Sequence, residues 1–232
     1  MAAPVSVIIP TYQAADRLGP CLAALAEGLG DGILRELIIV DCGSQDGIEA
    51  LADAIGAEFM LAPRGRGRQL AAAARRARGS WFLFLHADTV LEPGWGTSVI
   101  EHVSKHPQKA GWFRLRFDTP GFWPWLVAGW ANLRARHLGL PYGDQGLLIH
   151  RALYSAVGGY PEIALMEDVA LVRALRGRLA PLSCAAVTSA ARYRAEGWLR
   201  RGLRNQLVML RYLFGVSPER LSALYEKGQS GG

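Results

Sequence analysis

Short runs of β-branched and aromatic residues alternate with helical patterns over the first ~110 residues. The apolar runs are residues 5–9, 36–40, 58–62 and 80–85. Helical patterns separate them at residues 16–28, 48–55 and 69–78. Parallel strands joined by crossover helices produce this order. We therefore expect an α/β fold whose central sheet is mostly parallel, Rossmann-like and flanked by helices.

The run at 80–85 is followed at once by His86 and Asp88. A short apolar run bounded by turn residues predicts a strand that is buried on both faces. Open parallel sheets bind ligands beyond the carboxyl ends of their strands. His86 and Asp88 are therefore candidate ligand-binding or metal-binding residues. Asp88 also fits a second role, in which it only caps the turn that follows.

Composition sets the protein class. Half of the 232 residues are hydrophobic and a fifth are charged, which predicts a globular chain with a sizeable core. Three cysteines without metal-site spacing suit a reducing compartment. The N-terminus lacks the pattern of a signal peptide, and no apolar stretch is long enough to span a bilayer. We expect a cytoplasmic protein.

The net charge of +6 is concentrated in two segments. Residues 64–78 hold six arginines and no acid, and residues 192–212 hold six arginines and one glutamate. Such clusters favour anionic ligands, for example phosphates or acidic lipid headgroups. No nucleic-acid-binding module is recognisable, and the arginines are not interleaved with aromatics. A nucleic-acid partner is therefore not expected.

A polar motif, Asp41-x-Gly43-Ser44-x-Asp46-Gly47, follows the predicted strand at 36–40. A carboxylate there can accept a hydrogen bond from a base or a ribose hydroxyl, and the glycines let the backbone approach a ligand. The alternative is a tight strand-to-helix turn with an aspartate cap. The motif alone leaves both interpretations open.

Four segments in order resemble the family 2 glycosyltransferases with the A-type glycosyltransferase fold. They are SVIIPTY at 6–12, IIVDCGSQDG at 38–47, FLHADT at 84–89 and MED at 166–168. The resemblance covers roughly residues 4–180, and the chain length and the FLHADT variant are similar to the radical-SAM/selenodomain-associated branch. It implies one domain over 1–232, with a nucleotide-sugar half (about 1–110) and an acceptor half (about 111–215). The acceptor half ends in a basic amphipathic helix, and residues 228–232 are expected to be a disordered tail.

The resemblance implies a nucleotide-diphosphate sugar donor, expected to be uridine-linked. Pro10, Thr11 and Tyr12 would line the base and ribose site, and Asp41 would contact the base. The implied nucleotide residues also include Arg66, Arg68, Ala87 and Asp88. For the two arginines the alternative is a solvated loop.

The family's Asp-x-Asp triplet is His86-Ala87-Asp88 in this sequence. Asp88 keeps the position that shares a divalent cation, Mn²⁺ or Mg²⁺, with the diphosphate. His86 replaces the first carboxylate. A neutral imidazole suits Mn²⁺ better than Mg²⁺, and it is alternatively a hydrogen-bonding partner of ribose or phosphate.

Asp168 matches the family's catalytic base. An inverting transfer needs a carboxylate that takes the proton of the acceptor hydroxyl. The alternative is helix capping, because acids before an apolar run start a helix well. The implied acceptor and sugar residues are Asp144, Gln145 and Glu167. For residues 143–146 a plain turn is the alternative.

The second basic segment offers two roles. Arg192 and Arg194 are expected to close over the diphosphate. The helix at 197–214 carries an apolar stripe at Leu199, Leu203, Leu207, Leu210 and Phe214. This stripe, like the aromatic segment 119–140, suits an anionic membrane surface. The alternative is that both stripes pack on the domain and leave the arginines in water.

These inferences together predict an inverting hexosyltransferase-type glycosyltransferase with a hydroxyl acceptor that is lipid-linked. A peripheral association with the inner face of the cell membrane is part of the hypothesis. The alternative, raised by His86, is a nucleotide-sugar-binding or membrane-docking protein that has lost turnover.

Overall fold

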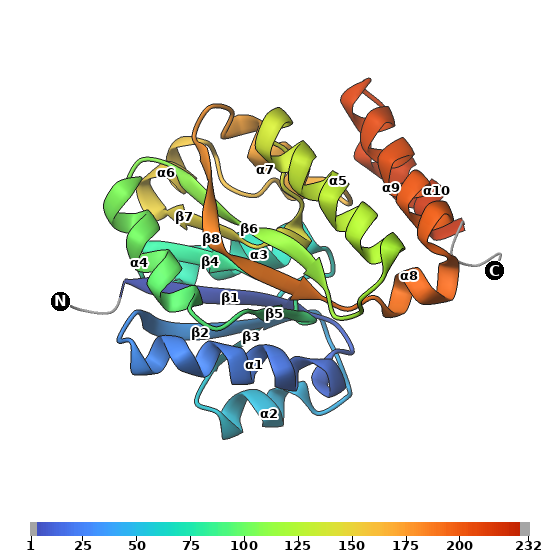
Figure 1. The fold of residues 1–232 in the computed structure, drawn as a ribbon. Helices are drawn as coiled ribbons and strands as arrows, with labels where there is room; N and C mark the ends of the chain where they lie inside the picture. Colours follow the sequence, from blue (N-terminus) through green and yellow to red (C-terminus); the bar gives the residue numbers. More distant parts are fainter. Residues whose placement is uncertain (1–3, 228–232) are drawn as a thin grey trace.

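One eight-stranded sheet runs through residues 4–227, the part of the chain described by this computed structural model (Figure 1). The strand order is β3-β2-β1-β4-β7-β6-β8-β5. The strands are β1 (Val5–Thr11), β2 (Leu34–Asp41), β3 (Glu58–Leu61), β4 (Trp81–Phe84), β5 (Thr89–Leu91), β6 (Ala110–Phe117), β7 (Leu147–His150) and β8 (Leu179–Thr188). The predicted tail at 228–232 lies outside the described residues.

Helices cover both faces of this sheet (Figure 1). They are α1 (Ala15–Gly30), α2 (Ile48–Ala54), α3 (Arg66–Arg76), α4 (Trp95–Lys105), α5 (Phe122–Leu138), α6 (Arg151–Ala156), α7 (Glu167–Ala174), α8 (Ala191–Glu196), α9 (Trp198–Leu213) and α10 (Pro218–Lys227), with a 3₁₀ turn η1 (Gly143–Gln145). Within residues 4–227, none of these helices combines the length and apolar character needed to cross a membrane.

Strands β1 to β4 pair in parallel, as the strand–helix alternation predicts. Beyond β4 the sheet is mixed, because β7 runs antiparallel to β4 and β6 antiparallel to β7. Several elements of the structure are absent from the sequence prediction, among them β5, α4, α6, β8, α8 and α10. β5 has three residues, and β8 contains a proline and several alanines, so neither shows a strand-like apolar alternation.

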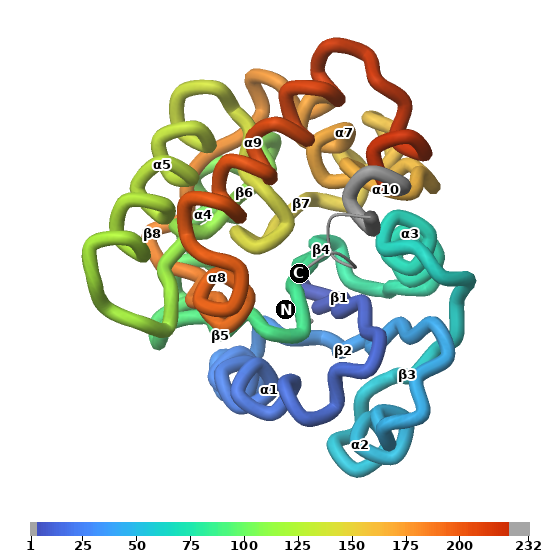
Figure 2. The backbone as a smooth tube through the Cα atoms, turned by 90° about the vertical axis from the view of Figure 1, so that its right-hand side faces the viewer, coloured from blue at the N-terminus to red at the C-terminus, as the bar shows by residue number. Residues whose placement is uncertain are grey.

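The alternation of side chains along β1 divides the core in two. Val5, Val7 and Ile9 pack against α1, α2 and α4, whereas Ile8 packs against α3, α6 and α7. Figure 2 shows α1 and α2 on one side of β1 and β2, with α3 on the other. Both faces of the parallel strands are therefore buried, which leaves the strand ends as the place for a site.

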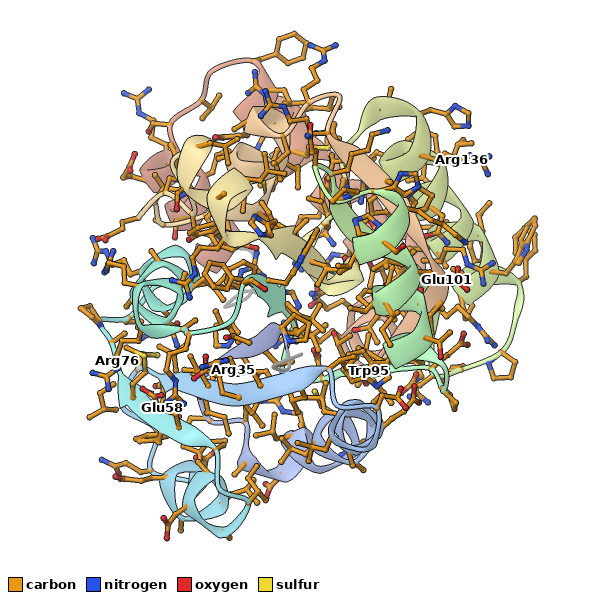
Figure 3. All side chains as sticks on the ribbon, turned by 90° about the vertical axis from the view of Figure 1, so that its left-hand side faces the viewer. Arg35, Glu58, Arg76, Trp95, Glu101 and Arg136 are labelled. Atoms are coloured by element: carbon orange, nitrogen blue, oxygen red, sulfur yellow. The ribbon has the colours of Figure 1, made fainter. Side chains whose placement is uncertain are left out.

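Trp95 anchors α4 to α1 (Figure 3). Its side chain is fully buried, and its Nε1 donates a hydrogen bond to the carbonyl of Ala24 at 2.9 Å. Gly28 permits this contact, since a Cβ there would lie 2.5 Å from the indole ring. The packing explains why α1 carries a glycine on its buried side.

Candidate functional site

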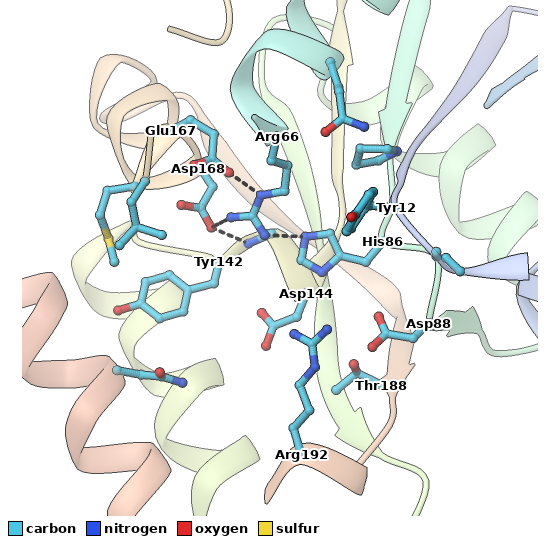
Figure 4. A pocket seen from close by; sticks show the side chains of 18 of the residues that line it. Tyr12, Arg66, His86, Asp88, Tyr142, Asp144, Glu167, Asp168, Thr188 and Arg192 are labelled. Carbon is cyan, nitrogen blue, oxygen red and sulfur yellow. Dashed lines mark hydrogen bonds and ion pairs between the residues drawn. The ribbon is translucent and has the colours of Figure 1, made fainter. Parts of the chain in front are cut away.

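A cavity of about 610 Å³ opens beyond the carboxyl ends of β1 and β4, within the size range of small-molecule sites. Its remaining walls come from the first turn of α3, η1, the start of α7, and α8 with α9. Figure 4 shows Asp168 on one side of this space and Asp88 on the other. Chain segments far apart in sequence thus meet at one edge of the sheet, as expected for an open α/β fold.

Most of the predicted site residues line this cavity. They are Pro10, Thr11, Tyr12, Arg66, His86, Ala87, Asp88, Asp144, Glu167, Asp168 and Arg192. Asp41, Arg68, Gln145 and Arg194 are not among the lining residues. Sequence reasoning assigned no site role to several other lining residues: Arg17, Arg64, Gln69, Thr188 and Asn205. Of these, only Arg64 carried a signal, as a member of the first arginine cluster.

Asp41 is buried beneath the cavity wall rather than exposed in it. Its Oδ1 accepts hydrogen bonds from the backbone N–H groups of Gly43 (2.7 Å) and Ser44 (2.6 Å). Its Oδ2 accepts from Thr11 Oγ1 at 2.8 Å and Ser44 Oγ at 2.7 Å. Burial raises the pKa of Asp41, but these hydrogen bonds outweigh it and hold the pKa below its usual value. In this arrangement Asp41 shapes the loop and orients Thr11. Both of its carboxylate oxygens already accept hydrogen bonds within the fold, so no free carboxylate is left for the predicted contact with a base.

Arg66 is the hub of the site (Figure 4). Its guanidinium donates hydrogen bonds to Glu167 and to His86 Nε2, the latter at 3.0 Å, and its Nη2 lies 3.4 Å from Asp168 Oδ2. A guanidinium only donates, so Nε2 of His86 is the acceptor and the proton is on Nδ1. Burial, with the nearby charge of Arg66, lowers the pKa of His86 to about 4. His86 is therefore neutral and keeps no lone pair for a metal ion, in contrast to its predicted role as a ligand.

The acidic pair at the start of α7 is held by hydrogen bonds. Burial raises the pKa of Glu167. The positive charge of Arg66 lowers it, but burial outweighs this effect. Asp168 Oδ2 accepts from the N–H of Gly143 at 2.9 Å, and Oδ1 accepts from the N–H of Val169 at 2.8 Å. Asp168 thus lies in the acidic first turn of α7 and also lines the cavity, although the sequence presented a helix-start role and a site role as alternatives.

Asp144 and Gln145 follow each other in η1, but only the side chain of Asp144 is available to a ligand in the cavity. Asp144 lines the cavity, and its buried Oδ1 has no hydrogen-bond partner within the described residues. Burial raises the pKa of Asp144 to about 6, against the charge of Arg134. Gln145 is fully buried and bonds to the carbonyl of Phe113 and the N–H of Tyr142. Its amide is thus occupied within the fold, and its predicted sugar contact is not possible in this arrangement.

The two remaining arginines point elsewhere. Arg68 is exposed outside the cavity, as in the solvated alternative, but it lies in helix α3 rather than in a loop. Arg194 is exposed and lies 3.9 Å from Asp118. The neighbouring arginines Arg64 and Arg192 line the cavity instead.

Asp88 is the residue in this cavity best suited to a divalent cation. Its carboxylate lines the cavity in the loop after β4, and oxygen ligands suit both Mg²⁺ and Mn²⁺. Residues 4–227 contain no group of three or more His, Cys, Asp or Glu side chains placed to hold a metal ion. The donor set fits a cation that takes one carboxylate from the protein and further oxygens from a bound diphosphate.

The model of glycosyl transferase family 2 matches residues 6–155. This chain belongs to glycosyl transferase family 2. As a family 2 glycosyltransferase it has the predicted A-type fold, and the predictions of family and of enzyme class are confirmed. Its membership of the radical-SAM/selenodomain-associated branch stays a prediction.

Solved structures share the fold of this family 2 glycosyltransferase at low sequence identity. S. aureus TarS 1-349 in complex with UDP-GlcNAc is 16% identical with a TM-score of 0.64, over 80% of this chain and 58% of that one. Glucosyl-3-phosphoglycerate synthase from Mycobacterium tuberculosis, with Mn²⁺, UDP and phosphoglyceric acid, is 18% identical with a TM-score of 0.60. That match covers 92% of this chain and 79% of the synthase chain. This chain thus spans under two thirds of the TarS fragment, and no curated protein matches it in sequence.

Proposed function

We propose that this glycosyltransferase transfers a sugar, with inversion, from a uridine-diphosphate sugar to a hydroxyl acceptor. The observation that carries the proposal is the placing of Asp88 and Asp168 across one cavity (Figure 4). A cation-binding carboxylate and a proton-accepting carboxylate on opposite walls leave room for a donor between them. The UDP and UDP-GlcNAc in the related structures support the choice of donor.

In the proposed reaction Asp168 takes the proton from the acceptor hydroxyl, and the oxygen of that hydroxyl attacks the anomeric carbon. The bond between that carbon and the diphosphate oxygen breaks, and the nucleoside diphosphate leaves with the electron pair. Asp168 accepts hydrogen bonds from two backbone N–H groups and lies beside Arg66, which fix its orientation. Arg64, Arg66 and Arg192 line the cavity and offset the charge of the leaving diphosphate.

A divalent cation, Mn²⁺ or Mg²⁺, is part of the proposal. Asp88 would hold it, and when bound it supplies additional positive charge to the diphosphate. Pro10, Thr11 and Tyr12 form the wall proposed for the base and ribose. Arg64 lies 5.0 Å from the centre of the Tyr12 ring, which places a cation at the edge of that wall.

For the acceptor we propose a lipid-linked hydroxyl that is met by a cytoplasmic enzyme at the inner face of the cell membrane. α9 supports this, because Arg201, Asn205 and Val208 line the cavity while leucines of the same helix are exposed on its other side.

A binding screen with uridine and guanosine diphosphates and their sugars, with and without Mn²⁺, tests the donor. UDP and a UDP-sugar are expected to raise the melting temperature, since a ligand that binds the folded state stabilises it. Asp88→Asn should remove the effect of Mn²⁺, and Asp53→Asn on the exposed side of α2 is the matched control. No shift with any nucleotide would contradict the proposal. Tight binding without release of UDP from any UDP-sugar would favour a protein that has lost turnover.

A further inference from the structure

The amphipathic helix α9 packs on the domain by one side and exposes an apolar stripe on the other. Leu199 and Leu203 are 64% and 63% exposed, and Phe214, just after the helix, is 87% exposed. The buried side of α9 holds Arg201, together with Val208 and Met209. The alternative in which the stripe packs on the domain is therefore wrong for α9. Its apolar stripe points to solvent.

Helix α5 adds a second exposed apolar surface next to the first. Its small residues, such as Ala128 and Ala131, are buried in a cluster with Leu115 and Phe117 of β6. Its large side chains point outward: Phe122, Trp123, Trp125, Leu126, Trp130, Leu133 and Leu138. Figures 1 and 2 show α5 and α9 side by side on the same flank of the molecule. Two neighbouring apolar stripes of this size are unusual for a surface that meets only water.

The charges on these two helices have one sign. Neither α5 nor α9 contains an aspartate or a glutamate. Arg136 of α5 and Arg200 and Arg211 of α9 are exposed beside the apolar side chains. Tryptophan and leucine flanked only by arginine are the composition of surfaces that lie in the headgroup region of an anionic bilayer.

We propose that the outer sides of α5 and α9 form a docking face for an anionic lipid bilayer. This α5–α9 face consists of the α5 side chains named above with Leu199, Leu203, Leu207, Leu210 and Phe214, and the flanking Arg136, Arg200 and Arg211. A second copy of the chain is a poorer occupant. Self-association would bring together two surfaces whose charged side chains are all arginines, and these would repel each other. Phospholipid headgroups offer the opposite charge, and acyl chains accept the leucines and the aromatic rings.

Docking by this face would bring the candidate site close to the membrane. The inner side of α9 lines the cavity with Arg201, Asn205 and Val208, so one helix, about 10 Å across, separates the cavity from the docked surface. A lipid-linked acceptor could then reach Asp168 around α9 without leaving the bilayer. This last step rests on the proposed function, whereas the docking itself does not.

Vesicle flotation with the full chain tests the proposal. The vesicles contain either pure phosphatidylcholine or about 30% phosphatidylglycerol, at about 0.05 M and about 0.5 M salt. Binding to the anionic vesicles at low salt is expected, with weaker binding to the neutral ones and at high salt. The double variant Leu199→Gln/Leu203→Gln should bind at least about tenfold more weakly, because each leucine loses its burial in the bilayer.

Matched controls lie on the opposite half of the fold. Leu29 and Leu61 are 65% and 68% exposed, so Leu29→Gln/Leu61→Gln removes equal apolar surface and should leave vesicle binding unchanged. Arg200→Gln/Arg211→Gln should weaken binding to anionic vesicles, by roughly fivefold per arginine. Exposed Arg35→Gln on β2 is the matched charge control.

Three outcomes would overturn the proposal. They are no flotation of the full chain, flotation lost equally in the Leu29/Leu61 control, and a concentration-dependent dimer in sedimentation that the Leu199/Leu203 variant abolishes. UDP binding, measured in parallel by melting temperature, separates the docking hypothesis from the proposed glycosyl transfer. Leu199 and Leu203 do not line the cavity, so their variants should keep UDP binding whatever happens to docking.

Discussion

The guanidinium of Arg66 lies 3.0 Å from Nε2 of His86, in the loop that follows β4. The same guanidinium pairs with the acids at the start of α7, so α3, β4 and α7 are joined at one point. Where the family's motif has a carboxylate, this chain thus has a neutral imidazole bonded to an arginine. The charge of that arginine is opposed there by Glu167 and Asp168.

Arg66→Met should lower the free energy of unfolding by about 2–4 kcal/mol, because it leaves the buried carboxylate of Glu167 without a partner. Adding Glu167→Gln should restore part of the loss, which a double-mutant cycle in urea measures. The control is Arg76→Met, which breaks the more exposed pair with Glu58 (Figure 3) and should cost less than about 1 kcal/mol. Equal losses in both arginine variants would count against a hub at Arg66.

Asp168→Asn should reduce kcat/KM by roughly 10²- to 10⁴-fold, because the amide cannot accept the proton of the acceptor hydroxyl. The melting-temperature shift with UDP should remain, since the variant keeps the shape of the cavity wall. Exposed Asp53→Asn on α2 serves as the control and should keep full activity. Turnover retained in Asp168→Asn would exclude this residue as the base.

Asp144 should make the protein less stable as the pH rises through the window from about 4 to about 6. Its pKa is raised to about 6 in the folded state from an ordinary 3.8, so the folded chain binds more protons in that window. Asp144→Asn should therefore be more stable than the parent by about 1–3 kcal/mol at pH 8, and the gap should close toward pH 4. Urea unfolding at pH 4.5, 6 and 8 measures this, with exposed Glu162→Gln as control. A gap that does not change with pH would contradict the prediction.

Glu36 should have the opposite pH dependence. Burial raises its pKa, but hydrogen bonds from Ser6 Oγ (2.5 Å) and from Arg78 Nε (2.6 Å) bring it below the ordinary value of 4.5. Its contribution to stability is therefore present above pH 4.5 and is lost as the pH falls through the lower folded pKa.

Glu36→Gln should thus cost about 2–3 kcal/mol at pH 7 and less in acid, as measured by urea unfolding. Exposed Glu49→Gln on α2 should cost little at either pH. A loss in Glu36→Gln that is as large at pH 3 as at pH 7 would show that the carboxylate charge is not what stabilises this contact.

Local sequence was sufficient for the parallel half of the fold and for the place of the site. The short runs of β-branched and aromatic residues predict β1 to β4, because strand formation there depends on apolar residues close together in the sequence. The end of β4 then fixes where Asp88 lies. The motif ending in Asp168 gave the second wall of the cavity. Family and enzyme class followed from these segments together.

Only the tertiary structure decided which polar atoms remain available. Asp41 and Gln145 carry suitable chemistry, but hydrogen bonds within the fold, from the N–H of Ser44 to Asp41 and from Gln145 to the carbonyl of Phe113 in β6, use their polar atoms. The amphipathic period of α9 likewise defines an apolar stripe without stating which way it faces. That stripe faces solvent because the opposite side of α9 packs on the domain through Trp198, Met209 and Leu213, with the buried Arg201 paired to Glu196. Such outcomes depend on contacts between distant segments, and a single sequence read along its length does not contain them.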